Sequence, residues 1–201
     1  MGLNRSKKDD TLIKKRSGSE RGLTMEQIIL GGGCFWCLEP VFQALVGVTE
    51  VVPGYCGGHL AQPSYEQVCR GDTGHVEVVR VTYDPALISC KNVLEIFFAC
   101  HDPTTLDRQG NDVGPQYASV IFASTPAQMA IAVALRDEMS ALFDAPICTR
   151  IEMAGPFWPA EAVHHGYYEK YPDQGYCRYV IAPKLAGFRR RHAQWLKPPV
   201  P

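Results

Sequence analysis

A short apolar run that ends in three glycines, and is followed at once by a helical pattern, most strongly limits how this chain can fold. Residues 26–30 predict a strand, and Gly31-Gly32-Gly33 predicts the turn that stops it. Apolar side chains then recur at helical spacing, at Phe35, Leu38, Phe42 and Leu45. Pro40 is tolerable only near the first turn of such a helix, and Gly47 predicts its end.

The rest of the pattern extends this strand–turn–helix unit into an α+β order. Residues 48–52, 76–83 and 118–123 predict strands, and helices are expected from Ser89 to Cys100 and from Thr125-Pro126 to about residue 143. The order βαββαβ is that of the ferredoxin-like split βαβ core. A strand at 148–153 and a short helix at 164–170 belong to a decorated, loop-rich C-terminal part. Polar loops at 54–74 and 102–116 exceed the usual connection length, which is typical of functional loops.

Composition places the chain among ordinary globular proteins. Its 201 residues suit one domain, expected over residues 25–201, and a formal net charge of −1 gives no general basic field for nucleic acid. No run of 18 apolar residues predicts a membrane span. With eight cysteines and no signal-peptide pattern, we expect mostly free thiols in a reducing, cytoplasmic setting. Monomer is the default, because no apolar helix face is left over.

Residues 1–24 differ from the rest of the chain. They hold seven basic and three acidic residues with little apolar periodicity, which predicts a disordered basic tail. The start, Met-Gly-x-x-x-Ser, matches a loose myristoylation pattern. A start of translation at Met25 and a weak nucleic-acid arm are the other hypotheses.

Cys34 stands where the glycine turn enters the helix. Free backbone N–H groups and the positive helix end stabilise a thiolate there, which indicates a catalytic nucleophile. Three alternatives stay open from the residues alone. Cys34 and Cys37 form a C-x-x-C redox pair, or they belong to a zinc site, or both are core cysteines. Zinc is the weakest of these, because no second pair of ligands stands at a usable spacing.

A colinear series of motifs carries a family resemblance. The motifs are, in chain order, Gly32-Gly33-Cys34-Phe35-Trp36; Gly54-Tyr55-Cys56-Gly57-Gly58-His59; Pro63-Ser64-Tyr65; Gly71-Asp72-Thr73-Gly74-His75-Val76-Glu77; Tyr83-Asp84-Pro85; His101-Asp102-Pro103-Thr104-Thr105; Arg108-Gln109-Gly110-Asn111-Asp112-Val113-Gly114-Pro115-Gln116-Tyr117; Ala154-Gly155-Pro156-Phe157-Trp158-Pro159-Ala160-Glu161; and Gly175-Tyr176-Cys177. Over roughly residues 26–187 the chain resembles the class A peptide methionine sulfoxide reductases. Many motifs in the right order are far more specific than one short pattern.

The resemblance implies an enzyme that reduces methionine sulfoxide, free or in proteins and with the S epimer at sulfur preferred, to methionine. It implies oxidative-damage repair, a ferredoxin-like core, and thioredoxin or another dithiol as reductant. We expect no bound cofactor: neither a Gly-x-Gly-x-x-Gly pattern nor a P-loop for a nucleotide occurs. We also expect no metal, because no second pair of ligands stands at a usable spacing. Methionine sulfoxide and thioredoxin are the expected partners.

The resemblance also implies roles for individual residues. Cys34 attacks the sulfoxide sulfur, and Glu77 is the acid. Phe35 and Trp36 hold the S-methyl group, Tyr65 and Tyr117 bind the sulfoxide oxygen, and Asp112 shapes the polar side of the site. Each has a structural alternative. Glu77 could face solvent from its strand, the two tyrosines could be rim residues, Asp112 could be a turn residue, and Phe35 or Trp36 could belong to the core.

Cys34 then ends as a sulfenic acid, which a second cysteine resolves to a disulfide. The family's Gly-Tyr-Cys segment makes Cys177 the first choice, since Pro172 to Gly175 predicts a flexible segment. Cys37 is the rival, although a disulfide to Cys34 is expected to distort the first helical turn.

One segment departs from the family pattern. Glu-Asp-Tyr-His-Gln is usual after Pro-Ala, and this chain has Glu161-Ala162-Val163-His164-His165. Two other functions compete with the reductase. A general thiol–disulfide oxidoreductase would use Cys34 and Cys37 without Glu77, and a zinc-binding interaction module would bind metal.

Overall fold

One mixed sheet forms the centre of the protein. The computed structural model describes residues 24–198, and its main sheet has the strand order β7-β6-β1-β3-β2-β8. The strands are β1 (Glu26–Gly32), β2 (Val48–Cys56), β3 (Val76–Tyr83), β6 (Ser119–Ala123), β7 (Arg150–Met153) and β8 (Trp158–Pro159). The inner four strands, β6-β1-β3-β2, pair antiparallel, and β7 adds to β6 in parallel. This inner order confirms the predicted ferredoxin-like core.

Five α-helices of the described chain connect or cover these strands beside the short α2: α1 (Phe35–Gln43), α3 (Cys90–Cys100), α4 (Pro126–Met139), α5 (Tyr167–Lys170) and α6 (Ala182–Arg191). The predicted caps are confirmed. The Ser89 hydroxyl accepts from Asn92 N at the start of α3, and the Thr125 hydroxyl accepts from Gln128 N before Pro126 in α4. Pro40 was expected only near the first turn of its helix, but it lies beyond that turn, inside α1.

Several local features differ from the sequence prediction. β2 continues to Cys56, and the expected loop behind it contains a short helix, α2 (Tyr65–Cys69). The second long loop contains a hairpin of β4 (Arg108–Gln109) and β5 (Asp112–Val113). The C-terminal part is helical, with a π-helix (Cys177–Ile181) that runs into α6. Four 3-10 turns complete the part of the chain that the structure describes: Pro115–Tyr117, Ser140–Leu142, Ala162–His164 and Ala193–Trp195.

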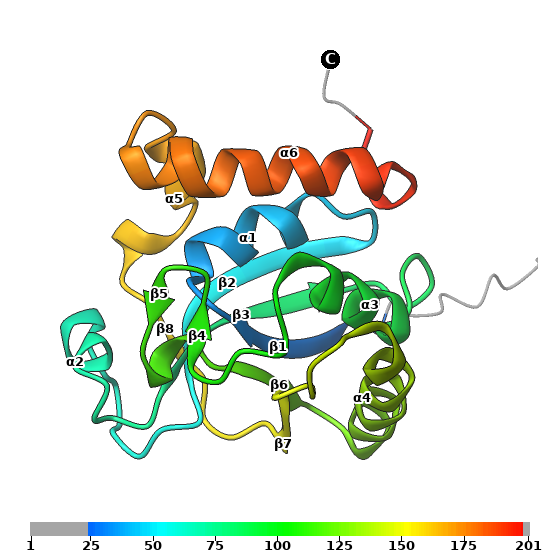
Figure 1. Cartoon of the computed structure of the whole chain (residues 1–201), viewed down its shortest axis with the longest axis horizontal. Coiled ribbons are helices and arrows are strands. Elements are labelled where there is room, and N and C mark those ends of the chain that lie inside the picture. The colour runs from blue at the N-terminus through cyan, green and yellow to red at the C-terminus, as the bar shows by residue number, and fades with distance from the viewer. Residues whose placement is uncertain (1–23, 199–201) are drawn as a thin grey trace, which may run out of the picture.

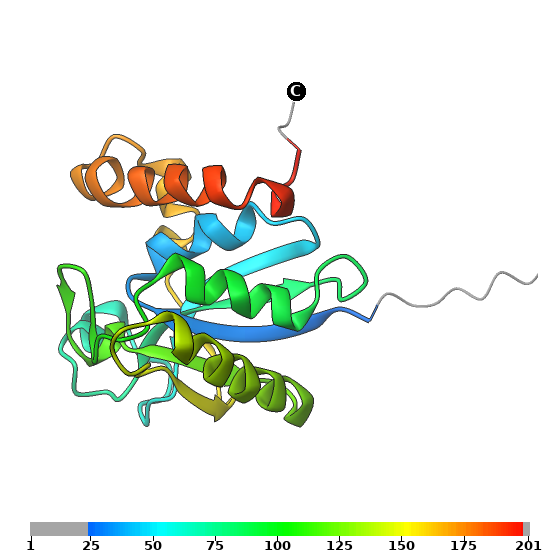
Figure 2. The same ribbon diagram turned by 45° about the vertical axis from the view of Figure 1, so that its right-hand side comes forward.

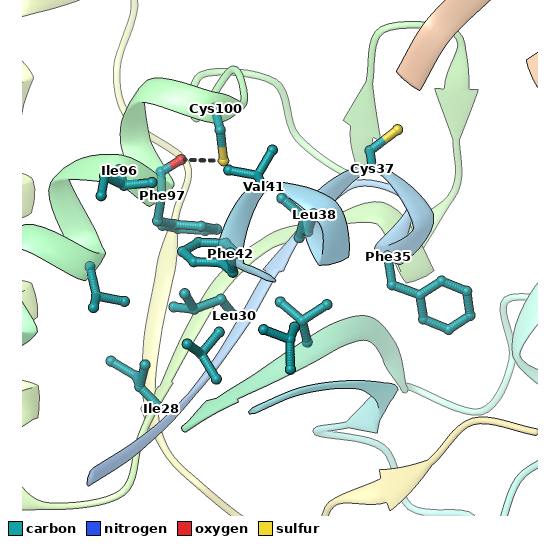
Figure 3. Packing of buried hydrophobic residues seen from close by; sticks show 14 of the residues in the cluster. Ile28, Leu30, Phe35, Cys37, Leu38, Val41, Phe42, Ile96, Phe97 and Cys100 are labelled. Carbon is teal, nitrogen blue, oxygen red and sulfur yellow. Dashed lines mark hydrogen bonds between the residues drawn. The ribbon is translucent and has the colours of Figure 1, made fainter. Parts of the chain in front are cut away.

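The main core lies between the sheet and α1 with α3. Figure 3 shows Ile28 and Leu30 of β1 packed beneath Leu38, Val41 and Phe42 of α1. In Figure 1, α6 lies across the outer side of α1, and its buried residues Leu185 and Phe188 belong to the same core. Burial of large apolar side chains on both sides of α1 fixes the position of its N-terminus.

A second, smaller apolar cluster covers the opposite face of the sheet. It contains Val76 and Val78 of β3 and Phe122 of β6, with Phe157 packed against it. β3 therefore presents Val76 and Val78 to one face and Val79 and Val81 to the other, as its alternation predicts. Figure 2 shows the molecule from a second side, with α6 and α1 stacked above the sheet.

Two predictions fall outside the described residues or are not tested by them. The basic tail expected over residues 1–24, with its myristoylation pattern, lies outside the described residues except for Thr24. A single catalytic domain over residues 25–201 stays a prediction. Within residues 24–198, no helix is both long enough and apolar enough to cross a membrane.

Candidate active site

Cys34 lies between β1 and α1, at the position that caps the helix. Its ψ of 127° is not helical, so α1 begins one residue later, at Phe35. Gly33 before it has φ of +93°, and a Cβ there would lie 2.7 Å from the side chain of Gln109. Only glycine fits this turn without displacing the β4–β5 hairpin. Cys34 is 7% exposed and lines a cavity of about 210 Å³.

Glu77 lies on β3 directly opposite Tyr55 of β2, and it is 1% exposed. The solvent-facing alternative for this residue is therefore wrong. Its Oε2 accepts a hydrogen bond from the backbone N–H of Phe35 at 3.1 Å. Burial raises the pKa of Glu77 to about 8, and the negative charge of Asp112 adds to the rise. The carboxyl consequently holds a proton at neutral pH beside the helix start that carries Cys34.

The thiols of Cys34 and Cys37 form a coupled pair. Burial raises the pKa of Cys34, and its contacts with Cys37 and Glu77 raise it further. The expected lowering of this pKa by the helix end is therefore wrong for the free enzyme, because burial outweighs it. The hydrogen bond from Cys34 lowers the pKa of Cys37 to about 7, with a further contribution from Lys184.

An aromatic cluster covers one side of Cys34. The Trp36 ring stacks on Tyr167 with centroids 3.8 Å apart and an interplanar angle of 7°, and Tyr65 lies against His164 at 4.4 Å. Phe35 is fully buried, and its ring centroid lies 5.5 to 6.4 Å from those of Trp36, Tyr65 and His164. Of the two predicted methyl-binding residues, Phe35 belongs to the core, whereas Trp36 is partly exposed.

Tyr65 is held in place by the start of α2. Ser64 caps this helix through a capping box, in which its hydroxyl accepts from Gln67 N and the Gln67 side chain accepts from Ser64 N. Glu161 fixes the same end. Its Oε1 accepts from Tyr65 N at 2.8 Å, and its Oε2 accepts from the Tyr55 hydroxyl at 3.0 Å.

Tyr117 and Asp112 reach the site from the β4–β5 region. Burial raises the pKa values of the Tyr65 and Tyr117 hydroxyls, and the charge of Glu77 raises both further, so these hydroxyls remain donors. Asp112 lines the cavity and its Oδ2 accepts from the Tyr176 hydroxyl at 2.7 Å. Cys34, Cys37 and Asp112 thus line one cavity, and Trp36, Tyr65 and Tyr117 pack against the core cluster that contains Cys34 and Phe35.

Cys177 occupies different surroundings from those expected. It is fully buried and is the first residue of the π-helix, so it does not lie in a flexible loop. All eight cysteines of the chain are free thiols in this structure.

Four residues near the site had no predicted role: Glu161, His164, Tyr167 and Tyr176. Glu161, His164 and Tyr176 stand in segments that the motif comparison covered, and their polar or aromatic type is the signal that could have found them.

This chain departs from the family pattern at Ala162 and Val163, and the departure has little effect on the site because both side chains are exposed. His164, in contrast, is buried in the aromatic cluster. Among residues 24–198, no group of three or more His, Cys, Asp or Glu side chains is arranged to hold a metal ion.

Comparison with known proteins decides the family. The family model described as "Peptide methionine sulfoxide reductase" matches residues 26–196. The chain belongs to this family. A peptide methionine sulfoxide reductase MsrA of Ralstonia nicotianae is 56% identical over 179 residues, which cover 86% of this chain and 94% of that protein. An MsrA of Thermus thermophilus is 49% identical, over 84% of this chain and 96% of that protein.

Solved structures agree with this placement. Reduced Mxr1 from Saccharomyces cerevisiae has a TM-score of 0.71 at 33% identity, over 76% of this chain and 89% of that one. Methionine sulfoxide reductase A of Corynebacterium diphtheriae has a TM-score of 0.69 at 34% identity, over 77% and 78% of the two chains. The protein is an oxidoreductase of the MsrA type that reduces methionine sulfoxide, with the α+β fold of this family.

Proposed function

We propose that the reaction takes place at Cys34 and passes through a sulfenic acid. The Cys34 sulfur attacks the sulfur of the sulfoxide, while a proton is delivered to the sulfoxide oxygen. The oxygen ends on Cys34, so that a thiol and a sulfoxide become a sulfenic acid and a thioether. The observation that supports this proposal is that Cys34 lines a cavity at the start of α1, where the buried Glu77 carboxyl, with its raised pKa, accepts a hydrogen bond from Phe35 N.

Glu77 is the proton donor in this proposal. A sulfoxide sulfur is a poor electrophile until its oxygen is protonated or strongly hydrogen-bonded, so the site needs an acid beside the nucleophile. The raised pKa of Glu77, about 8, keeps the carboxyl protonated without help from the substrate. Tyr65 and Tyr117 supply further hydroxyl donors toward the same oxygen, and Asp112 shapes the polar wall.

The aromatic cluster supplies the apolar side. Trp36 is partly exposed and packs against the buried ring of Phe35. The Trp36 ring can therefore contact the S-methyl group, while the Phe35 ring holds it in position. Preference for the S epimer is part of this proposal, as membership of the family implies, and it requires that the rest of the substrate also has only one direction open to it.

The enzyme must then be reset. A second cysteine of the chain attacks the sulfenic acid and releases water, and a dithiol reduces the resulting disulfide. Cys177 and Cys37 are the two candidates. Thioredoxin is the proposed reductant. Mxr1 of Saccharomyces cerevisiae, similar to this chain in its reduced form, has also been solved in complex with Trx2.

Turnover with each epimer tests the proposal. With thioredoxin present, the wild type and a Cys148→Ser control are expected to reduce the S-sulfoxide of N-acetylmethionine and to leave the R-sulfoxide. Cys34→Ser is expected to lose all activity, because the attacking sulfur is gone. Equal rates with both epimers, or sulfoxide reduction by Cys34→Ser, would contradict the proposal.

A further inference from the structure

We propose that Gln109 is a positioning residue for the reductase reaction. Its side-chain amide joins the β4–β5 hairpin to the chain that follows α3, and this joint sets where Cys34 and Asp112 lie relative to each other. The inference rests on the proposed function, since the position of Cys34 matters in this way only if its sulfur attacks the substrate. Gln109 acts through these neighbours and makes no contact with the reacting atoms in this proposal.

The amide of Gln109 pairs with the backbone of a single residue. Its Oε1 accepts from Asp102 N at 3.1 Å, and its Nε2 donates to the Asp102 carbonyl at 3.1 Å. The pairing uses the acceptor and a donor of the primary amide together, so it fixes the orientation of the amide as well as its distance. The hairpin is thereby bound to the backbone just beyond the end of α3.

The backbone on the other side of this pairing is itself held by the core. His101, the C-cap residue of α3, directly precedes Asp102 and is 8% exposed. Its Nδ1 lies 2.6 Å from the Phe97 carbonyl and its Nε2 lies 2.7 Å from Ser119 Oγ. The Ser119 hydroxyl lies in turn 2.7 Å from Thr149 Oγ1. Both ring nitrogens therefore have partners, and the end of α3 is fixed to the start of β6.

The Gln109 side chain also packs against the glycine turn that carries Cys34. A Cβ at Gly33 would lie 2.7 Å from both Cβ and Cγ of Gln109, and Figure 1 shows the hairpin beside the start of α1. Cys34 and Gln109 line the same 210 Å³ cavity. His101 makes the corresponding contact one residue earlier, since a Cβ at Gly32 would lie 3.0 Å from its Cγ. Successive positions of the turn thus contact two side chains whose anchors are neighbours in the chain.

Gln109 determines the position of Asp112 as well. The two residues are partners in the β4–β5 ladder, on either side of the hairpin turn. Asp112 lines the cavity beside Cys34 and accepts from the Tyr176 hydroxyl at 2.7 Å. A shift of the hairpin would therefore move Asp112 and loosen the glycine turn together. Misplacement of reacting groups by about 1 Å can lower a rate on the order of a hundredfold.

Two substitutions separate the amide pairing from the volume of the side chain. Gln109→Met keeps the Cβ and Cγ that pack on Gly33 and loses both hydrogen bonds. We expect its first-turnover rate with N-acetylmethionine S-sulfoxide to fall roughly 10- to 100-fold at every pH between 5 and 8.

Gln109→Glu can replace the amide only while its carboxyl is protonated, because the O–H then donates and the carbonyl oxygen accepts as the amide does. As a fraction of the wild-type rate at the same pH, its first-turnover rate is expected to rise about tenfold from pH 8 to pH 5. The sulfoxide concentration at half-maximal rate is expected to change less than about threefold in both variants, since the loss lies in the alignment of Cys34 with bound sulfoxide.

Gln128→Glu is the matched control. Gln128 also bridges backbone groups, because its Oε1 accepts from Ser124 N and its Nε2 donates to the Gln27 carbonyl, but it lies outside the Cys34 cavity. This control is expected to lower the free energy of unfolding and to leave the first-turnover rate of the folded enzyme unchanged. All rates are therefore compared under conditions in which circular dichroism shows each variant to be folded.

The outcomes separate the two proposals. A wild-type first-turnover rate in Gln109→Met, a relative rate of Gln109→Glu that does not change with pH, or a loss confined to KM would overturn the positioning role while the proposed function stands. Sulfoxide reduction by Cys34→Ser, or no methionine derivative from folded wild type, would reject the proposed function and the positioning role with it.

Discussion

Glu77 is a carboxylic acid almost without access to water, and its position explains much of the site. One backbone N–H, from Phe35, bonds to it, which favours the ionised form. Burial opposes this effect and is larger, so the net result is a pKa of about 8. We propose that this buried strand residue, held protonated by its surroundings, is the proton donor beside Cys34.

Glu77→Gln tests the role of this proton. The first-turnover rate at pH 7 is expected to fall roughly 10²- to 10⁴-fold, because the amide cannot deliver a proton to the sulfoxide oxygen. In the wild type, the raised pKa of Cys34 makes that rate rise with pH, and the rise is expected to level off above about pH 8, where the carboxyl ionises. Rapid-quench measurement of methionine across this range checks both results. An unchanged first-turnover rate in Glu77→Gln would reject the acid role.

The same variant has a second, independent readout in stability. The folded-state pKa of Glu77 lies above its usual value of 4.5, so between pH 4.5 and 8 the folded state holds a proton that the unfolded state has lost. The free energy of unfolding therefore falls as pH rises through this window. Glu77→Gln is expected to remove that fall, on the order of a few kcal/mol, in denaturant titrations at pH 5 and pH 8.

Among the elements, α2 shows how a short helix can position a functional residue. It has only five residues, which is too short for stability on its own, and Tyr65 is its first residue. The Ser64 capping box and the Glu161 carboxylate hold this end. The sequence pattern placed these residues in a loop, because so short a helix gives no readable periodicity. The tyrosine itself was still found, through the Pro63-Ser64-Tyr65 motif.

Two N-cap substitutions separate the function of α2 from general stability. Ser64→Ala is expected to raise KM for the sulfoxide, by roughly 2- to 10-fold for a cap of about 1 kcal/mol, because α2 loosens locally around Tyr65. Thr125→Ala, at the cap of α4, is expected to lower the free energy of unfolding by about 1 kcal/mol and leave KM unchanged. Loss of global stability in Ser64→Ala with an unchanged KM would contradict this account.

For the whole molecule, the parts that the sequence predicts are those fixed by local patterns. Alternation placed β3 at Val76–Tyr83, and caps placed α3 and α4, so the ferredoxin-like order followed. The site depends on contacts between distant segments, such as Glu161 with Tyr65, 96 residues apart, and Tyr176 with Cys37, 139 residues apart. No local pattern encodes such pairs, and the helical C-terminal part that supplies them was expected to be loop-rich.

The wrapping of the C-terminal part over α1 also explains why the resolving cysteine could not be chosen from the sequence. Gly-Tyr-Cys suggested a swinging loop, but the segment forms a helix whose buried Leu185 and Phe188 join the core. Tyr176 and Cys177 are held against α1 as a result. Which of Cys37 and Cys177 resolves the Cys34 sulfenic acid therefore depends on the positions of their sulfur atoms in the folded chain, which the sequence pattern does not give.

Single-turnover reduction without external reductant is the most direct test of the central claim. Fully reduced enzyme is mixed with the S-sulfoxide of N-acetylmethionine, and the methionine derivative formed is compared with the thiols lost. The account predicts one product molecule for every two thiols lost, because the Cys34 sulfenic acid becomes an internal disulfide. Absence of product from folded enzyme would contradict the reductase itself, and one thiol lost per product would contradict resolution by an internal cysteine.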